Sequence, residues 1–171
     1  FPGVEYRPEQ FPGLVYRLKK PKTATLIFSS GKMVCTGAKS ERQARKAVLK
    51  VVDELKRDGI VILGRPEIMI QNIVASCGLG GRIDLEKAVY GLKKTMYEPE
   101  QFPGLIYRMD EPKVVILVFT SGKLVCTGAK KEIQVHIAVN KLQEILESKG
   151  LILYEGPEKP RLPPLPTKPA P

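Results

Sequence analysis

The sequence predicts an α+β fold made of two copies of one structural unit. The segment Glu9–Arg17 returns almost unchanged as Glu100–Arg108, and Ser30–Lys39 returns as Ser121–Lys130, each 91 residues later in the 171-residue chain. Over the 31 aligned positions that include both segments, 21 residues are identical. Tandem copies of this length usually pack as a pseudo-two-fold pair, which presents the same side chains twice to an extended and roughly symmetric partner.

Each copy predicts a β-hairpin. Pro21–Phe28 and Pro112–Phe119 are rich in the apolar and β-branched residues that strands favour. A Ser-Gly pair then leads into a second short run, Lys32–Thr36 in the first copy and Lys123–Thr127 in the second. Glycine readily adopts the positive φ that a tight turn needs, so the two runs in each copy are expected to pair as antiparallel strands.

A long helix is expected after each hairpin. Ser40 and Gln43 have the spacing of a capping box, in which two free backbone amides are satisfied reciprocally. Apolar residues then recur at helical spacing over Ala44–Leu55 and again over Ile133–Ile145, and a glycine follows each helix. Each helix has one apolar stripe and one charged face, so we expect it to lie on a sheet with its charged face in water.

The segment between the copies completes the repeating unit. Ile60–Leu63 and Ile68–Ser76 have the composition of strands, and Asp84 begins a shorter helix that extends to about Lys94. The unit is therefore a strand, a short helix, several antiparallel strands and a long helix, which is an α+β pattern.

The first copy is shorter than the second at its N-terminal end. Phe1 aligns with Leu92, so the first repeat lacks the N-terminal strand and short helix that the second has at about 69–91. We expect a truncated or incompletely represented protein, and a natural protein without that edge strand is the alternative. The domains expected are a first, incomplete repeat over 1–62, a second repeat over 63–153 and a proline-rich tail over 154–171.

The tail has seven prolines in its last sixteen residues. Proline cannot continue a helix or an inner strand, so the tail is predicted to be disordered. Residues 163–168 also fit a short pattern that polyproline-binding domains recognise.

Composition narrows the class of partner. The chain carries 28 Lys and Arg against 18 Asp and Glu, a net charge of +10, which favours nucleic acid before a membrane surface. The longest apolar run, Val114–Phe119, is far too short to span a membrane, and the N-terminus does not resemble a cleavable signal. Three cysteines without C-x-x-C spacing argue against a disulfide framework and against zinc. We expect no cofactor, no membrane partner and a location in the cytoplasm or nucleoid (the nucleus in a eukaryote), not secretion.

Alternation along the hairpin strands sorts their side chains onto two faces. Cys35 and Cys126 lie on one face, and the other face carries a set of apolar side chains and threonines: Leu26, Phe28, Val34, Thr36, Leu117, Phe119, Val125 and Thr127. If the cysteine face receives the helices, the second face is left open, apolar and present twice. An exposed apolar surface of that extent usually marks a binding site.

These motifs resemble the TATA-box-binding protein family. The resemblance rests on Glu100–Met109 (EQFPGLIYRM), the repeated SGK-x-V-C-T-G-A-K segment, Ile70–Ser76 (IQNIVAS), Tyr97–Glu100 (YEPE) and the tandem repeat, and it covers about residues 1–153. It implies a pseudo-two-fold saddle, in which a curved antiparallel sheet binds DNA with its concave side and carries helices on its convex side. In style the sequence resembles archaeal rather than eukaryotic members.

The resemblance assigns a set of side chains to the DNA minor groove. Proteins of this kind insert apolar wedges between base steps and bend the duplex. The wedges implied are Phe11, Phe28, Phe102 and Phe119. The floor between them would be Leu26, Val34, Thr36, Asn72, Val74, Leu117, Val125 and Thr127. Asn72 and the threonines would hydrogen-bond base acceptors at the central step, where contacts favour A·T over G·C and flexible TA steps bend most easily.

Further residues are expected at the rim of the interface. Phosphate contacts would come from Arg17, Ser30, Lys32, Arg108, Ser121 and Lys123. Glu98 and Glu100 correspond to the acidic loop through which the family binds the B-type general transcription factor, whereas the first copy has Arg7 and Glu9 at those positions. The partners expected are therefore double-stranded promoter DNA, the B-type factor and, indirectly, RNA polymerase, and a homodimer away from DNA is left open.

Signatures of catalysis are weak. Cys77–Gly81 lies between a strand and a helix, as a dinucleotide fingerprint would, but Ile83 occupies the third glycine position. Gly31–Lys32 lacks the upstream glycine of a phosphate loop, and the single histidine, His136, has no partner motif. We expect a non-enzymatic factor for transcription initiation that binds and bends A·T-rich, TATA-like promoter DNA.

Two other functions stay open on the sequence alone. One is an accessory or protein-interaction module of the same fold without sequence-specific DNA bending. The other is a non-specific coat on DNA or RNA, which predicts steep salt dependence and no preference for A·T.

Overall fold

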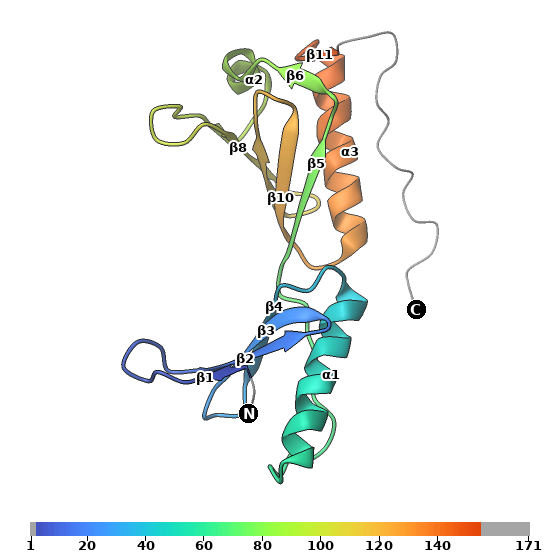
Figure 1. The fold of residues 1–171 in the computed structure, drawn as a ribbon. Helices are drawn as coiled ribbons and strands as arrows, with labels where there is room; N and C mark the ends of the chain where they lie inside the picture. The colour runs from blue at the N-terminus through green and yellow to red at the C-terminus, as the bar shows by residue number, and fades with distance from the viewer. Residues whose placement is uncertain (1–2, 155–171) are drawn as a thin grey trace. The chain divides into compact units, whose positions relative to one another are not determined.

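The structure, a computed structural model, describes residues 3–154, so the predicted proline-rich tail lies outside the described residues from position 155 onward. The described chain forms two compact units that divide between Met69 and Ile70. Each unit contains an antiparallel sheet with a long helix against one of its faces (Figure 1).

The first unit is a four-stranded sheet and one helix. Its strands follow one another in the order β1 (Val4–Glu5), β2 (Leu14–Lys19), β3 (Lys22–Ile27) and β4 (Met33–Thr36). The helix α1 (Glu41–Arg57) contacts β2, β3 and β4. Its buried side chains pack with those of β2 in a small core of Tyr16, Leu18, Ala47, Val51 and Leu55.

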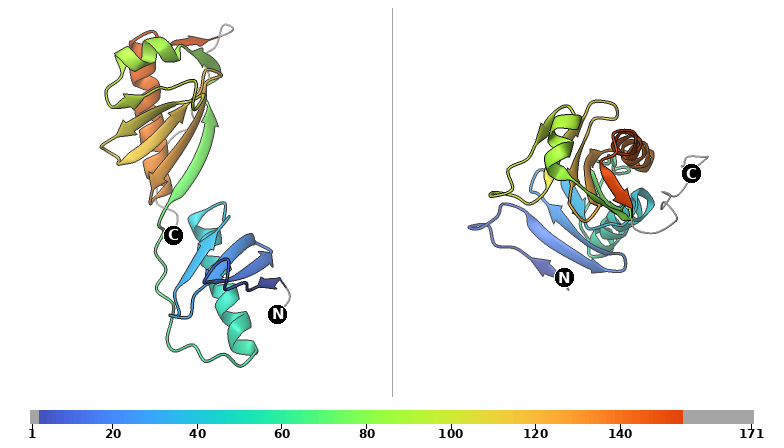
Figure 2. Two further views of the ribbon diagram at one scale, coloured as in Figure 1. Left: turned by 90° about the vertical axis from the view of Figure 1, so that its left-hand side faces the viewer. Right: turned by 90° about the horizontal axis from the view of Figure 1, so that it is seen from above.

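The second unit repeats this arrangement and adds to it. Its main sheet has the order β5 (Ile73–Gly78), β10 (Lys123–Ala129), β9 (Val114–Val118), β8 (Leu105–Met109) and β7 (Thr95–Met96). A two-stranded sheet joins β6 (Gly81–Ile83) to β11 (Ile152–Tyr154), and the helices are α2 (Leu85–Gly91) and α3 (Glu132–Ser148). Figure 2 shows α3 along one face of the main sheet. This unit's core has 18 buried residues against five in the first unit, so most of the described core lies in the second repeat.

The helix starts confirm the capping prediction with one change. Ser40 Oγ accepts a hydrogen bond from the Gln43 backbone N–H at 3.0 Å. The Gln43 side chain reaches back to the backbone N–H of Lys39, at 2.6 Å, one residue earlier than in the usual capping box. In the second unit Gln134 Oε1 accepts from the backbone N–H of Lys130 at 2.9 Å in the same way. Gln43 and Gln134 are equivalent positions, but α3 has Lys131 where α1 has the capping Ser40, and Gln134 also accepts from the Lys131 backbone N–H at 3.3 Å, as in the usual capping box.

The prediction of a strand at Ile60–Leu63 is wrong. The equivalent segment of the second unit is β11, which is a strand because β6 pairs with it. Among the described residues, the first unit has no counterpart of β6, so this segment is irregular and leaves Val61 82% and Leu63 90% exposed. A short apolar run becomes a strand only where a partner supplies its hydrogen bonds. The strand predicted at Ile68–Ser76 is displaced as well and begins only at Ile73.

One hydrogen bond ties helix to sheet in the first unit. The Tyr16 hydroxyl donates to the Glu54 carboxylate of α1. This bond, together with burial, raises the pKa of Tyr16 to about 12. The second unit has Tyr107 and Ile145 at the equivalent positions, so the bond is specific to the first.

We predict that Tyr16→Phe destabilises the chain by about 1–2 kcal/mol at neutral pH, because the hydrogen bond from the buried Tyr16 hydroxyl to the Glu54 carboxylate is lost. An unfolded tyrosine titrates near pH 10, so the wild-type stability from this group is complete below pH 10 and is lost as the pH rises toward 12. Urea unfolding at pH 7, 10 and 11.5 should therefore show a smaller loss of stability with pH in the variant. Tyr6→Phe, at a tyrosine that is 57% exposed, is the control and should unfold like wild type.

Candidate nucleic-acid interface

Each main sheet has one face packed on its helix and one face without a helix, and we call the second the open face. In β9, Val114, Ile116 and Val118 are buried in the core, while Val115 and Leu117 between them point to the open face. Cys126 is buried in the same core as α3, and burial raises the pKa of its thiol to about 11, so it stays neutral. This confirms the sequence prediction that the cysteine face receives the helix.

The open face of the second unit is an apolar strip. The strand register places a row of neighbours across all five strands: Ser76, Val125, Leu117, Ile106 and Met96. Val74 lies two residues before Ser76 in β5 and is 65% exposed. The predicted floor residues Val74, Leu117 and Val125 therefore lie on one surface.

The open face of the first unit has the same construction over its hairpin but is smaller, because no strand among the described residues of that unit corresponds to β5. Its row is Val34, Leu26, Val15 and Glu5. The predicted floor residues Leu26 and Val34 are adjacent and half-buried, and Thr36 lies in the next row, beside Ala24. The row ends in a carboxylate where the second unit has a methionine.

The four predicted wedge phenylalanines form two matching pairs. The ring centroids of Phe11 and Phe28 are 5.8 Å apart with the planes at 61°, and those of Phe102 and Phe119 are 5.8 Å apart at 68°. Both are edge-to-face arrangements, which aromatic rings prefer. Phe11 is 38% and Phe102 37% exposed, so each pair presents part of a ring to solvent.

Two glycines make room for these rings. A Cβ atom on Gly13 would lie 2.8 Å from Phe11 and 3.0 Å from Phe28, and one on Gly104 would lie at the same distances from Phe102 and Phe119. Contacts that short force the neighbouring atoms to move. Sequence reasoning missed the role of both glycines, although the repeated Phe-Pro-Gly-Leu segment contains them.

Asn72 and Thr127 are brought together at one end of the second open face. Asn72 Oδ1 accepts a hydrogen bond from the Gly128 backbone N–H at 2.7 Å, which fixes the orientation of the amide. Its Nδ2 then lies 3.3 Å from Thr127 Oγ1. The Thr127 hydroxyl in turn donates to Asn72 Oδ1 at 3.5 Å, so the exposed Asn72 and the half-buried Thr127 are hydrogen-bonded to each other, and the amide group of Asn72 keeps a second N–H. In the first unit, Thr36 Oγ1 donates to the Ala24 carbonyl at 3.3 Å.

The predicted phosphate contacts lie around the two open faces and do not gather at one point. Ser30 and Lys32 occupy the β3–β4 turn, where Ser30 Oγ accepts from the Lys32 backbone N–H at 3.4 Å, and Ser121 and Lys123 repeat this bond at 3.4 Å. Arg17 extends from β2 and lies 3.2 Å from a Glu5 carboxylate oxygen, whereas Arg108 extends from β8.

The predicted partner loop is a turn held by its own backbone. The Glu98 carbonyl accepts hydrogen bonds from the backbone N–H groups of Gln101 and Phe102, both at 2.9 Å. Glu98 and Glu100 are exposed in this turn. In the first unit, the Arg7 carbonyl makes the equivalent bonds to Gln10 and Phe11, at 3.0 and 2.9 Å, so the loops share a backbone turn and differ in charge.

Comparison with known proteins identifies the family. A family model described as "Transcription factor TFIID (or TATA-binding protein, TBP)" matches residues 1–57 and 67–149. The chain belongs to the TATA-box-binding protein family. A TATA-box-binding protein of Pyrodictium occultum is 63% identical over 144 residues, which are 84% of this chain and 72% of that relative. One of Pyrobaculum calidifontis is 55% identical over 154 residues, or 90% and 77% of the two chains.

A solved structure confirms the fold at the level of the family. The structure of Methanococcus jannaschii TBP superposes with a TM-score of 0.77 and 51% sequence identity, covering 85% of this chain and 83% of that one. The α+β class and the family resemblance expected from the sequence are thus confirmed. The TATA-box-binding protein family is non-enzymatic, as the sequence predicted.

Within residues 3–154, no group of His, Cys, Asp and Glu side chains is arranged to hold a metal ion. None of the helices described there has the length and apolar character needed to cross a bilayer.

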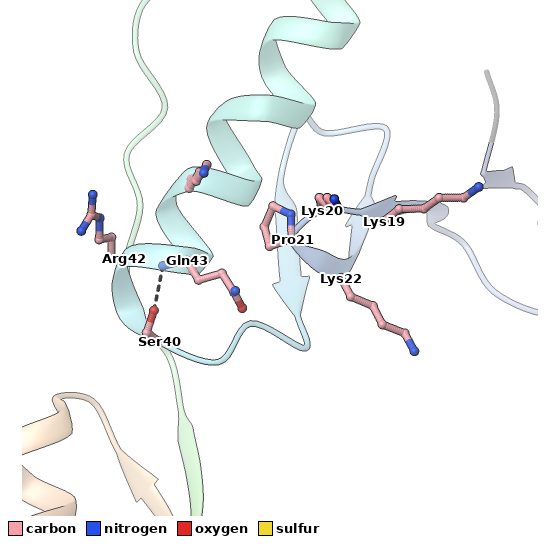
Figure 3. A pocket seen from close by; sticks show the side chains of 8 residues that line it. Lys19, Lys20, Pro21, Lys22, Ser40, Arg42 and Gln43 are labelled. Carbon is pink, nitrogen blue, oxygen red and sulfur yellow. Dashed lines mark hydrogen bonds between the residues drawn. The ribbon is translucent and has the colours of Figure 1, made fainter.

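This family member also has a basic cleft in its first unit (Figure 3). The cleft lies between the β2–β3 turn and the start of α1 and is lined by Lys19, Lys20, Pro21, Lys22, Ser40, Arg42, Gln43 and Lys46. At the positions of Lys19, Lys20, Arg42 and Lys46 the second unit has Asp110, Glu111, Ile133 and Ile137. The positive charge of the cleft is therefore specific to the first unit. The sequence analysis did not find the cleft, because it relied on positions that are identical in the two copies, and the charged residues of the cleft lie mostly at positions where the copies differ.

We predict that Gly104→Ala weakens DNA bending, because the new methyl group displaces Phe102 or Phe119 from the edge-to-face pair. The end-to-end distance of a doubly labelled TATA duplex, measured by fluorescence energy transfer, should shorten less at saturating protein. The control is Gly91→Ala on α2, which adds the same methyl group against the side chains of Leu151 and Lys149 and should bend DNA like wild type. Equal bending by both variants would show that the glycine does not position the rings.

Proposed function

We propose that the chain is a general transcription initiation factor that binds the minor groove of A·T-rich, TATA-like promoter DNA and bends it by phenylalanine wedging. The observation that carries this proposal is the pair of open, apolar sheet faces, each with an edge-to-face phenylalanine pair at its end. Family membership supplies the class of ligand, since the relatives are TATA-box-binding proteins.

The chemistry of the open faces suits an opened minor groove. Leu26, Val34, Leu117 and Val125 offer no hydrogen-bonding groups, so they match sugar and base edges rather than polar solvent. The second N–H of the Asn72 amide, and the Thr127 hydroxyl once it exchanges its bond to Asn72, are donors that suit the acceptors that A·T and T·A pairs both present in that groove. A guanine amino group would bring a donor against these donors, so A·T pairs are favoured.

The arrangement expected is the pseudo-two-fold saddle that the sequence repeat and the family suggest. In this proposal the repeats 1–62 and 63–153 supply the two halves of the concave surface. Arg17, Arg108, Lys32, Lys123, Ser30 and Ser121 then contact phosphates on either side of the groove. The loop of Glu98 and Glu100 recruits the B-type factor, and RNA polymerase follows through that factor.

We predict that Phe28→Ala and Phe119→Ala each lower the affinity for a TATA-like duplex by about tenfold, since one aromatic–base stack is worth roughly 1–3 kcal/mol. Each variant should also reduce the energy-transfer change that reports bending. A scrambled G·C-rich duplex is the control and should not shorten with any protein. Equal binding of wild type to both duplexes without bending would refute the proposed function and favour a non-specific coat or an accessory module.

We predict that reversing Glu98 and Glu100 together to Arg abolishes the ternary complex with the B-type factor and spares DNA binding. The two carboxylates lie on an exposed turn whose shape depends on backbone hydrogen bonds, so the change alters charge and not fold. Electrophoretic mobility shift with DNA alone and then with both proteins separates the two effects. Glu9→Arg, in the equivalent loop of the first unit, is the matched control and should keep the ternary complex. A ternary complex that survives the double reversal would remove these residues from the partner interface.

A further inference from the structure

Glu5 lies at the edge of the open face of the first unit. It is the register partner of Val15, whose row continues to Leu26. Its neighbour Val4 packs against the core on the helix side, and side chains alternate along a strand, so the Glu5 carboxylate is directed to the open face. Arg17, two residues after Val15, extends on the same face.

The Glu5 carboxylate is shared by two arginines. One oxygen is 3.2 Å from Arg17 Nη1 and the other is 3.3 Å from Arg7 Nε. The side chains of Arg17 and Glu5 are 58% and 44% exposed, so the pair can open toward a ligand. An anion that binds Arg17 must nevertheless compete with a carboxylate that is already in place.

The second unit has no such competitor. Met96 takes the position of Glu5, beside Ile106 at the end of the open-face row, and is 52% exposed. Among the described residues, Arg108, the equivalent of Arg17, forms no ion pair with a carboxylate. The two copies therefore carry the same arginine in different electrostatic surroundings.

We propose that Glu5 is a positioning residue that weakens the Arg17–phosphate contact, so that the two units hold the DNA backbone unequally. This inference rests on the proposed function, in which both arginines contact phosphate. The wedges, the glycines and the floor residues of the hairpins are the same in the two units, whereas Asn72 and Val74 have no counterpart among the described residues of the first. A TATA-like element is itself nearly symmetric. Unequal phosphate contacts would add an electrostatic difference between the two directions of binding to the difference that β5 makes in the open faces.

The test is the salt dependence of binding to a TATA-like duplex. Each phosphate contact releases counterions and contributes about one unit to the slope of log affinity against log salt. Glu5→Gln frees Arg17 and should steepen the slope by about one, so that its affinity relative to wild type falls about three- to fourfold between 50 and 200 mM salt. Met96→Glu introduces the competitor beside Arg108 and should flatten the slope by a similar amount. The double variant should return to the wild-type slope.

Two controls separate this effect from net charge. Asp53→Asn on α1 removes the same charge as Glu5→Gln from an exposed position on the helix and should leave the slope unchanged. In an Arg17→Gln background, Glu5→Gln should lose most of its effect. Equal slopes for Glu5→Gln and Asp53→Asn, or a full effect without Arg17, would overturn the inference. Failure of the proposed function gives a different result: the wild-type protein would then show no preference for the TATA-like duplex over the G·C-rich one, whatever the variants do.

Discussion

The whole interface depends on one constraint: each main sheet has a helix on only one of its faces. Side chains alternate along every strand, so burying one face against α1 or α3 commits half of the strand residues to the core. Each large apolar side chain buried there contributes roughly 1.5–3 kcal/mol to folding. The apolar residues of the open face gain much less from folding, and they remain available to a ligand. In the proposed function, fold stability and DNA contact thus belong to opposite faces of the same strands.

The two repeats keep one set of features and vary another. The phenylalanine pairs, the glycines beneath them, the serine-capped turns and the glutamine caps of the long helices are the same in both units. β5, β6 and α2 have no counterpart among the described residues of the first unit. The other differences are mainly in charge and lie at the rim: Met96 takes the position equivalent to Glu5, Glu98 that of Arg7 and Glu111 that of Lys20. The hairpin faces of the two units are therefore alike in their apolar side chains and differ in the charge at their rims, and in the proposed function this difference distinguishes the two directions in which a nearly symmetric DNA site can be bound.

The sequence was sufficient wherever local pattern decides structure. Hairpins, long helices and the sorting of Cys126 and Leu117 onto opposite faces followed from alternation and helical spacing, whereas which face the helix covers was only a condition that the structure then fulfilled. It failed at Ile60–Leu63, because a strand needs a partner and no local pattern shows whether one is present. It also missed Gly13 and the Glu5–Arg17 pair, since ring clearance and ion pairing depend on distances between side chains that the sequence does not contain. The candidate surface could thus be located in advance, but not its internal contacts.

The close packing of the phenylalanine rings has a consequence for the speed and cost of recognition. Phe102 is held against Phe119 and above Gly104, where the space for a methyl group is already filled by the ring. Its rotamer freedom is therefore restricted before any DNA arrives, and the entropy of ordering it is lost on folding rather than on association. If Phe102 is a wedge, as proposed above, the deformation of the duplex is then the main barrier to binding. Differences between promoters should then reflect how easily each base step opens, more than how the protein rearranges.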